Sequence, residues 1–297
     1  MKKLNIGFFA DGKWAHKALS LFLNDKDINI SFICPRFKSP DKFLLKQALD
    51  QEIDLIKHPN INDSEFVEKL LSYRCDLFIS MSFDQIFKKT ILNIPNLGTI
   101  NCHASKLPFY RGRNNLNWVL INGEKDFGIT VHYVDEGIDT GDIILQKIFP
   151  IDDNDNYSTL LELSFKECPI LLYQSVILIR EQKVKSIKQD SICSKGSYCK
   201  RRKEGDEFIN WDKNTRDLFN FVRGITFPGP CATSFVNKKL IKIINSEIPK
   251  FNKFDNGIPG EIIDLCKDYF IVKTKDGGLK VTKWDCPVKL ILGDKLN

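Results

Sequence analysis

Two side chains that could carry out acyl and proton transfer, Asn101 and His103, lie two residues apart in the sequence. They end an apolar run near residues 97–102, which predicts a strand whose alternate side chains share one face. An amide can donate a hydrogen bond to a developing oxyanion, and an imidazole can accept and return a proton near neutral pH. On this spacing alone, a histidine with a purely structural role is the better interpretation.

A second polar segment, residues 134–144, follows about one strand–helix–strand unit later and is both acidic and punctuated by glycine. As a loop between two strands, it could close over a site and offer a carboxylate. Calcium binding is an alternative, although the oxygen spacing does not follow an EF-hand loop. Taken alone, the segment is best interpreted as a solvated acidic turn. Its carboxylates are Asp135, Glu136, Asp139 and Asp142.

Taken together, the two segments resemble the formyltransferases that use N10-formyltetrahydrofolate. The pattern of that family is Asn-x-His-x-Ser-x-Leu-Pro-x-(Tyr/Trp)-Arg-Gly, then Gly-(Ile/Val)-Thr, then Asp-x-Gly-x-Asp-Thr-Gly. Every part is present, in residues 101–112, 128–130 and 135–141. In that family the Asn, the His and the Asp before Thr-Gly are catalytic. The resemblance assigns this role to Asn101, His103 and Asp139.

The carboxyl-terminal part of the chain extends the resemblance. Residues 208–212, 220–223 and 227–230 are similar to the opening of the family's carboxyl-terminal barrel. Cys231 departs from the family, which commonly has Ala there. We expect this small side chain to have a packing role.

Three classes of acceptor occur in the family: methionyl-tRNA, glycinamide ribonucleotide, and amino sugars attached to a nucleotide. Residues 113–124 closely resemble the sugar-nucleotide enzymes, whereas the tRNA enzymes usually have Ala-Ala-Pro-Ile-Gln after Arg-Gly. The segment 35–40, where a tRNA enzyme would insert a basic loop, is short, and no concentrated basic surface for nucleic acid is evident. A glycinamide ribonucleotide enzyme would typically lack the barrel.

The predicted acceptor is therefore a nucleotide-linked amino sugar. The family's range favours dTDP-4-amino-4,6-dideoxyglucose or its 3-amino isomer, used in surface-polysaccharide synthesis such as that of the lipopolysaccharide O-antigen. A methionyl-tRNA formyltransferase is the first alternative. A non-catalytic sugar-nucleotide-binding module is the second, although all three polar residues of the predicted trio are present.

The resemblance also implies binding residues for the co-substrate, N10-formyltetrahydrofolate. The family places the pterin ring against the end of the fourth strand and the aspartate loop, where apolar side chains would sandwich it. Several of these residues fit a plain core position equally well. The predicted set is Met81, Ser82, Phe83, Ile86, Leu107 and Asp139.

Residues for the sugar nucleotide are predicted at three places. The turn at Gly12 opens a helix whose N-terminus could hold a phosphate, with a simple tight turn as an equal alternative. Arg113 could bind a diphosphate through two N–H groups, or it could be a surface charge. Arg201 and Arg202 match a Tyr-x-Arg-Arg segment of the enzyme that acts on UDP-4-amino-4-deoxy-L-arabinose. The full predicted set is Lys13, Trp14, Ser105, Arg111, Arg113, Arg201 and Arg202.

The elements that must position these residues indicate an α/β fold. Alternating apolar runs and amphipathic stretches predict a Rossmann-like, mostly parallel sheet, followed by a smaller β-barrel of the OB-like type. The predicted domains are residues 1–188 and 206–297, joined by a linker at 189–205. Expected strands lie near 4–10, 29–34, 53–56, 76–80, 97–102, 128–135, 142–149, 231–236, 239–245, 259–265, 268–274 and 278–284. Expected helices lie near 13–24, 39–50, 63–73, 84–91, 113–122, 157–181 and 212–224.

Composition narrows the class of protein. The 297 residues carry a net charge of +6, spread along the chain, which suits an anionic small ligand more than a nucleic-acid groove. Nine cysteines without CxxC spacing, and only four histidines, predict free thiols in a reducing cytoplasm and no metal site. No apolar run is long enough for a membrane span. The oligomeric state stays open, with a homodimer among the expected states.

Overall fold

The computed structural model describes residues 3–251, 254 and 256–297. The chain divides into two compact units, each assembled from separate stretches of sequence. The N-terminal unit comprises Met1–Gly112, Gly128–Phe149 and Leu163–Tyr198. The C-terminal unit comprises Arg113–Phe127, Pro150–Glu162 and Cys199–Asn297. The predicted domain limits at residues 188 and 205 stay a prediction.

The N-terminal unit is built on a seven-stranded sheet in the order β3-β2-β1-β4-β5-β7-β8. The strands β3, β2, β1, β4 and β5 are parallel to their neighbours, whereas β7 runs antiparallel to β5. The predicted mostly parallel α/β sheet is therefore confirmed. The strands are β1 (Leu4–Ala10), β2 (Ile28–Cys34), β3 (Asp54–Leu55), β4 (Leu77–Met81), β5 (Thr99–His103), β7 (Asp126–Tyr133) and β8 (Ile143–Pro150).

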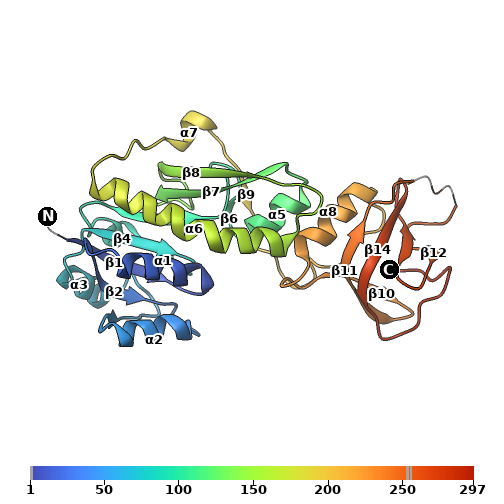
Figure 1. Ribbon diagram of the computed structural model, residues 1–297, viewed down its shortest axis with the longest axis horizontal. Coiled ribbons are helices and arrows are strands. Elements are labelled where there is room, and N and C mark those ends of the chain that lie inside the picture. Colours follow the sequence, from blue (N-terminus) through green and yellow to red (C-terminus); the bar gives the residue numbers. More distant parts are fainter. Residues whose placement is uncertain (1–2, 252–253, 255) are drawn as a thin grey trace. The chain divides into compact units, whose positions relative to one another are not determined.

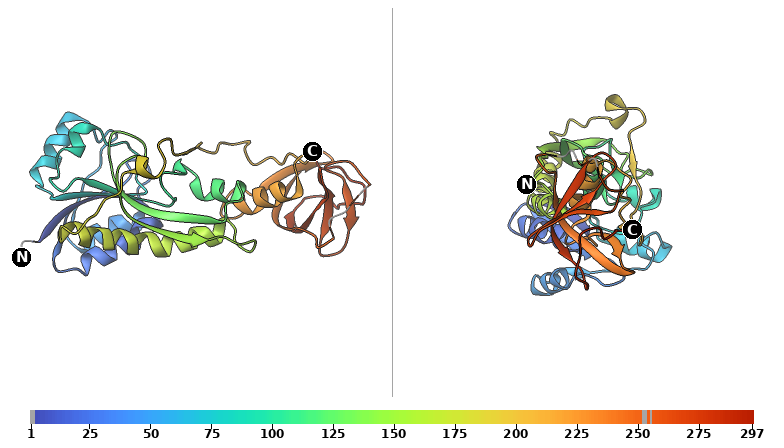
Figure 2. Two further views of the ribbon diagram at one scale, coloured as in Figure 1. Left: turned by 90° about the horizontal axis from the view of Figure 1, so that it is seen from above. Right: turned by 90° about the vertical axis from the view of Figure 1, so that its right-hand side faces the viewer.

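Helices cover both faces of this sheet because neighbouring strand residues point to opposite sides. Phe8 of β1 contacts Phe22, with ring centroids 5.5 Å apart, whereas Phe9 contacts Phe78 and Phe87 on the other face. Figures 1 and 2 show α1 and α6 along one face and α3 on the other. The helices are α1 (Lys13–Leu23), α2 (Lys42–Asp50), α3 (Ser64–Ser72), α4 (Lys89–Leu92), α6 (Tyr157–Arg180) and α7 (Gln189–Ile192).

The helix predicted at 84–91 is largely wrong, because α4 begins only at Lys89. Side-chain hydrogen bonds hold the preceding segment, residues 84–88, against the loop around residue 60 in a non-helical conformation. Gln85 accepts from the Ile61 N–H at 2.8 Å and donates to the His58 carbonyl at 2.9 Å. Asn62 in turn donates to the Ile86 carbonyl at 2.9 Å. Side-chain bonds of this kind compete with helical backbone bonds.

The C-terminal unit contains a curved five-stranded antiparallel sheet in the order β10-β11-β14-β13-β12 (Figure 2). Its last residues join the two edges, since Leu296 bridges to Val236 at the end of β10 and Lys295 bridges to Glu261 beside β12. The predicted carboxyl-terminal barrel is confirmed. The elements are α5 (Asn115–Ile121), α8 (Thr215–Ile225), β10 (Ala232–Val236), β11 (Lys239–Glu247), β12 (Ile262–Leu265), β13 (Phe270–Lys273) and β14 (Gly278–Asp285).

Helix α8 closes one side of this barrel core. It contributes Leu218, Val222 and Ile225 to a buried cluster that also contains Ile241 and Val281 from the strands. The helix also packs against α5, where the Asn117 amide donates to the Gly224 carbonyl at 2.7 Å. Residues of α5 are therefore held by the C-terminal unit.

Two absences apply to the part of the chain that the structure describes. No helix there is long and apolar enough to cross a membrane. No group of three or more His, Cys, Asp or Glu side chains there is placed to hold a metal ion.

Candidate active site

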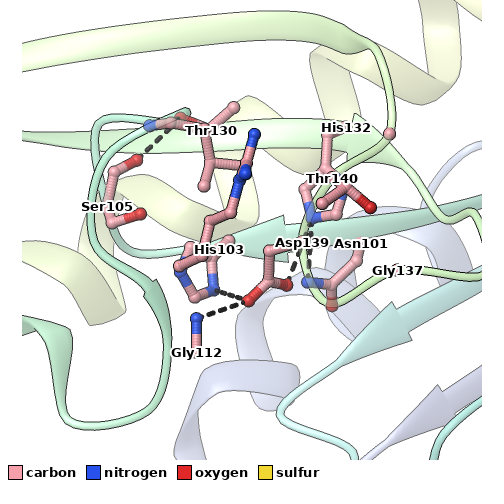
Figure 3. Close-up of polar contacts among 12 residues, drawn as sticks. Asn101, His103, Ser105, Gly112, Thr130, His132, Gly137, Asp139 and Thr140 are labelled. Carbon is pink, nitrogen blue, oxygen red and sulfur yellow. Dashed lines mark hydrogen bonds and ion pairs between the residues drawn. The ribbon is translucent and has the colours of Figure 1, made fainter. Parts of the chain in front are cut away.

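The antiparallel pairing of β5 and β7 brings four polar side chains to one face of the sheet. Asn101 lies opposite His132, and His103 lies opposite Thr130. Directly opposed residues in an antiparallel pair project to the same side, as do residues two apart on one strand. Figure 3 shows the side chains of Asn101, His103 and His132 converging on Asp139.

Asp139 is the common partner in this arrangement. Its Oδ2 accepts from the Gly112 N–H at 2.8 Å and lies 3.7 Å from His103 Nδ1. Its Oδ1 lies 3.5 Å from His132 Nε2. Asn101 Nδ2 lies 3.3 Å from the same His132 nitrogen. An amide, two imidazoles and a carboxylate therefore form one connected network.

The environment of Asp139 favours its charged form. Burial by itself raises the pKa of this carboxyl group. The positive charges that His103 and His132 carry when they are protonated, the hydrogen bond that the protonated His132 donates and the N–H of Gly112 lower the pKa by more, and the net pKa lies well below the usual range. Asp139 is thus a carboxylate across the whole neutral range of pH.

The contacts of His103 determine which of its nitrogens carries the proton in the neutral ring. Its Nε2 lies 3.1 Å from the carbonyl oxygen of Tyr110, which can only accept a hydrogen bond, so Nε2 carries the hydrogen. In this tautomer Nδ1 is the basic nitrogen. When Nδ1 gains a proton, the new charge faces Asp139, and the pair attracts at 3.7 Å.

The loop that carries Asp139 is held by a buried amide in the segment after α6. Asp139 has a left-handed backbone with φ of 54°, which is uncommon for a residue other than glycine. Gln189, only 1 % exposed, donates to the carbonyls of Asp139 at 2.9 Å and Gly141 at 2.8 Å. Its Oε1 accepts from Arg111 Nε at 3.0 Å and Nη2 at 2.7 Å. One side chain therefore ties the loop to β6 (Arg111–Gly112).

We expect Gln189→Leu to lower the free energy of unfolding by about 2–4 kcal/mol, because it leaves buried Arg111 donors and two carbonyls unpaired. The variant Gln189→Glu keeps an acceptor for Arg111 but loses both donors to the loop, and we expect the smaller loss of stability from it. Denaturant unfolding measures both effects. The exposed Gln174→Leu is the control. Equal stability of Gln189→Leu and the wild type would contradict this role.

The structure places the other predicted substrate residues of the N-terminal unit as follows. Ser105 is fully buried, and its hydroxyl donates to the Phe109 carbonyl at 3.1 Å. Arg111 is buried and donates to Gln189, and its guanidinium lies over the ring of Tyr198, 5.3 Å from the centroid. Lys13 is exposed, and Trp14 is half-buried against Phe165. Their assignment to a substrate stays a prediction.

The predicted folate residues differ in what they expose. Met81 and Leu107 are each only 1 % exposed, so their side chains are part of the core. Ile86 is 66 % exposed and Phe83 is half-buried, so these two offer apolar surface. The carbonyl of Ser82 is already occupied by the guanidinium of Arg36, at 2.6 Å.

Of the basic residues predicted in the C-terminal unit, Arg202 contacts α5. Arg113 and Arg201 are exposed. The guanidinium of Arg202 lies 5.7 Å from the ring centroids of both Trp118 and Phe221 and donates to the Asp206 carbonyl at 2.6 Å. Because burial outweighs the nearby carboxylates, the pKa of Arg202 is lowered from its usual value.

Two residues of the site were not predicted from the sequence: His132, which belongs to the network, and Gln189, which holds the Asp139 loop. His132 lies two residues after Thr130 of the predicted Gly-Ile-Thr segment, so the two side chains share one face of the strand. This spacing is a signal that could have identified His132. Gln189 has no such signal, because it lies in a polar segment where nothing indicates burial.

Comparison with known proteins identifies the family. The family model described as "Formyl transferase" matches residues 20–175, and the model described as "Formyl transferase, C-terminal domain" matches residues 201–292. Among curated proteins, the chain is similar to a methionyl-tRNA formyltransferase of Thermodesulfovibrio yellowstonii. The two are 38% identical over 236 residues, which is 80% of this chain and 74% of the relative.

Solved structures show the same fold along nearly the whole chain. One is WlaRD, a sugar 3N-formyl transferase determined in the presence of dTDP and 5-N-formyl-THF, with a TM-score of 0.69 and 26% identity, covering 98% of this chain and 100% of that one. Another is an N-formyltransferase from Helicobacter canadensis in complex with folinic acid and dTDP-3-aminofucose, with a TM-score of 0.69 and 24% identity, covering 96% and 100%. The chain therefore belongs to the formyl transferase family and is a formyltransferase enzyme.

Proposed function

We propose that this enzyme transfers a formyl group from N10-formyltetrahydrofolate to the amine of a nucleotide-linked amino sugar, with Asn101, His103 and Asp139 as the catalytic trio. The observation that carries formyl transfer at this place is the contact network itself, in which Asp139 lies against both His103 and His132 while Asn101 reaches the same His132 nitrogen. A donor for an oxyanion, a base and a carboxylate that stabilises the charged base are the groups that acyl transfer to an amine requires.

In the proposed reaction the unprotonated amine forms a bond to the formyl carbon. Asn101 donates an N–H to the formyl oxygen as that oxygen gains negative charge. A donor in this position is worth on the order of 3–4 kcal/mol of transition-state stabilisation. The contact with His132 uses one of the two hydrogens on Asn101 Nδ2, and the second remains for the oxyanion.

His103 moves the proton, and Asp139 makes this possible. The attacking nitrogen must lose a proton, and the N10 nitrogen must gain one when its bond to the formyl carbon breaks. His103 Nδ1 accepts the first proton and returns one to N10, so the enzyme ends in its starting state. Asp139 stabilises the intervening imidazolium, because it stays ionised and lies 3.7 Å from the nitrogen that is protonated.

Residues of the N-terminal unit fit a flat, partly apolar co-substrate. Ile86 and Phe83 follow the end of β4 and present apolar surface that a protein interior would normally cover. Their side chains could lie against the pterin ring. Met81 and Leu107 would contribute through their packing alone, since their side chains are buried. WlaRD, determined with a formylated folate, supports this co-substrate.

Two observations favour an amino-sugar acceptor. The first is the likeness to the sugar formyl transferase WlaRD over 98% of this chain and 100% of that one. The second is the segment after Arg-Gly, which binds the basic segment 200–202: Asn114 accepts from the Arg202 backbone N–H at 3.0 Å, and Trp118 donates to the Lys200 carbonyl at 2.8 Å. Arg202, fixed between aromatic rings, suits a diphosphate. We take dTDP-4-amino-4,6-dideoxyglucose, or its 3-amino isomer, as the first substrates to test.

A methionyl-tRNA acceptor is the second candidate, and the 38% identity to a tRNA enzyme favours it. Such an enzyme would neutralise several phosphates, so its turnover would fall steeply with salt concentration. A role in surface-polysaccharide synthesis, a cytoplasmic location and a homodimeric state stay predictions that accompany the amino-sugar hypothesis.

We expect the purified enzyme to consume N10-formyltetrahydrofolate only when an amino-sugar nucleotide is added. A panel of dTDP- and UDP-linked 3-amino and 4-amino sugars, run beside charged initiator tRNA, measures this directly. The specificity constant for the best sugar should exceed that for tRNA by at least about 10³-fold, because a sugar site lacks the phosphate contacts that tRNA binding needs. Faster, salt-sensitive formylation of the tRNA would assign the second candidate. Binding of the sugar nucleotides with no formyl transfer to any acceptor would leave only a binding module.

A further inference from the structure

His132 occupies a position that a structural histidine would not need. It is 1 % exposed and lies on β7 directly opposite Asn101. Burying a polar ring in a strand is unfavourable unless its nitrogens find partners. One nitrogen is satisfied within its own strand, since Nδ1 lies 2.6 Å from the Tyr133 carbonyl. The other, Nε2, is directed at Asn101 and Asp139.

The contact with Tyr133 determines the tautomer of the neutral ring. A carbonyl oxygen only accepts, so His132 Nδ1 must carry the hydrogen, and Nε2 of the neutral ring is then an acceptor. This matches the group that faces it at 3.3 Å, because Asn101 Nδ2 is a donor. The match also determines the orientation of the Asn101 amide. In the opposite orientation the amide oxygen would face the Nε2 lone pair, and two acceptors would repel each other.

We propose that His132 is a positioning residue for formyl transfer, which orients the Asn101 amide so that its second N–H faces the formyl oxygen. The same imidazole nitrogen lies 3.5 Å from Asp139 Oδ1, and Asp139 Oδ2 lies beside His103. His132 does not touch the reacting atoms in this scheme. It acts through Asn101. This inference rests on the proposed function of the site.

Replacing His132 should lower kcat without weakening substrate binding. We expect His132→Leu to lower kcat about 30-fold, with both KM values changed less than about threefold, because the orientation of one transition-state donor is lost. His132→Gln should recover most of that loss, since its Oε1 can accept from Asn101 at about the same place. A residue that only supports the fold would instead change the melting temperature and both KM values, without rescue by Gln.

A double-mutant cycle with Asn101→Ala tests whether His132 acts through Asn101. In the Asn101→Ala background, His132→Leu should lower kcat by less than about threefold, because the group that it orients is absent. An undiminished effect in that background would overturn the proposal, as would a His132→Leu enzyme with wild-type kcat. The same cycle is repeated with His132→Met and His132→Gln. These variants provide the comparison if the Leu variant does not fold.

The tautomer of His132 can be read without turnover. Nitrogen NMR of the histidine rings should show His132 protonated on Nδ1 and unprotonated on Nε2 at neutral pH, with the Nε2 signal displaced in Asn101→Ala. A proton on Nε2 would overturn the inference whatever the enzyme's substrate is. If Asn101→Ala and His103→Ala both kept full activity, the proposed chemistry of the site would fail instead, so the two failures are distinguishable.

Discussion

Replacing His103 with Ala should lower kcat about 10³-fold while the protein stays folded. In the proposed reaction His103 Nδ1 accepts the proton of the attacking amine, and general acid–base groups in such a position typically contribute between about 10² and 10⁴. The remaining groups, Asn101 among them, would still bind and polarise the formyl oxygen, so a residual rate is expected. Because His103 acts on the reacting atoms in the proposed reaction and is not among the predicted binding residues, the KM values should change little.

Single-turnover formation of tetrahydrofolate, with the best acceptor from the panel, measures this loss. The matched control is His58→Gln, since His58 lies in a loop with its Nδ1 against the Asn60 carbonyl and belongs to none of the contacts of the network. Added imidazole should restore part of the activity of His103→Ala by entering the space left by the ring, and should do nothing for the control. A His103→Ala enzyme within about tenfold of wild type would mean that another group moves the proton.

The positions of Asn101 and His103 were predictable because local rules govern them. A strand places residues two apart on one face, and the end of a parallel strand in an open α/β sheet is where ligands bind. The family pattern then connected Asp139 to them across an intervening helix. The observed contacts, 3.7 Å from His103 Nδ1 to Asp139 Oδ2 among them, agree with that connection.

The spacing of His132 was a signal that could have been used, but its partners, like the burial of Gln189, depend on tertiary pairing. The periodicity of β7 gives its two faces, but it does not say that β7 runs antiparallel to β5 or that His132 is the residue opposite Asn101. Gln189 follows Ile187, whose backbone pairs with Ile143, and this return of the chain is set by contacts between segments far apart in the sequence. The wrong prediction of a helix at 84–91 has the same cause, because Gln85 forms hydrogen bonds with a loop more than 20 residues earlier in the sequence.

Replacing Asp139 with Asn should lower kcat about 10²- to 10³-fold, and the structure indicates which part of its role is lost. In serine proteases, the corresponding change also leaves the histidine in the wrong tautomer. Here the Tyr110 carbonyl holds the hydrogen on His103 Nε2, so the tautomer should survive. The amide oxygen of the Asp139→Asn side chain can still accept from the Gly112 N–H, so the loop should keep its form. What disappears is the charge that stabilises the imidazolium.

The control for Asp139→Asn is Glu136→Gln in the same loop, which removes one negative charge from an exposed side chain paired with an exposed Lys89 at 3.8 Å. An exposed pair of this kind contributes little, so this variant should match the wild type. Chemical rescue of Asp139→Asn by imidazole is not expected, because the ring of His103 is already present. Wild-type kcat in Asp139→Asn would contradict the proposed role of the charge.

The pH dependence of stability separates the charge of Asp139 from its shape. The pKa of this carboxyl group is lower in the folded chain than the value of about 3.9 expected in the unfolded chain, so its charge stabilises the fold above that value and the contribution is lost as pH falls through the folded pKa. The difference in unfolding free energy between wild type and Asp139→Asn should therefore not shrink from about pH 8 to about pH 5, and it should shrink below about pH 4. A difference that already shrinks between about pH 7 and about pH 5 would mean that Asp139 protonates in that range. The carboxylate could then not hold the charge of the His103 imidazolium while the enzyme turns over.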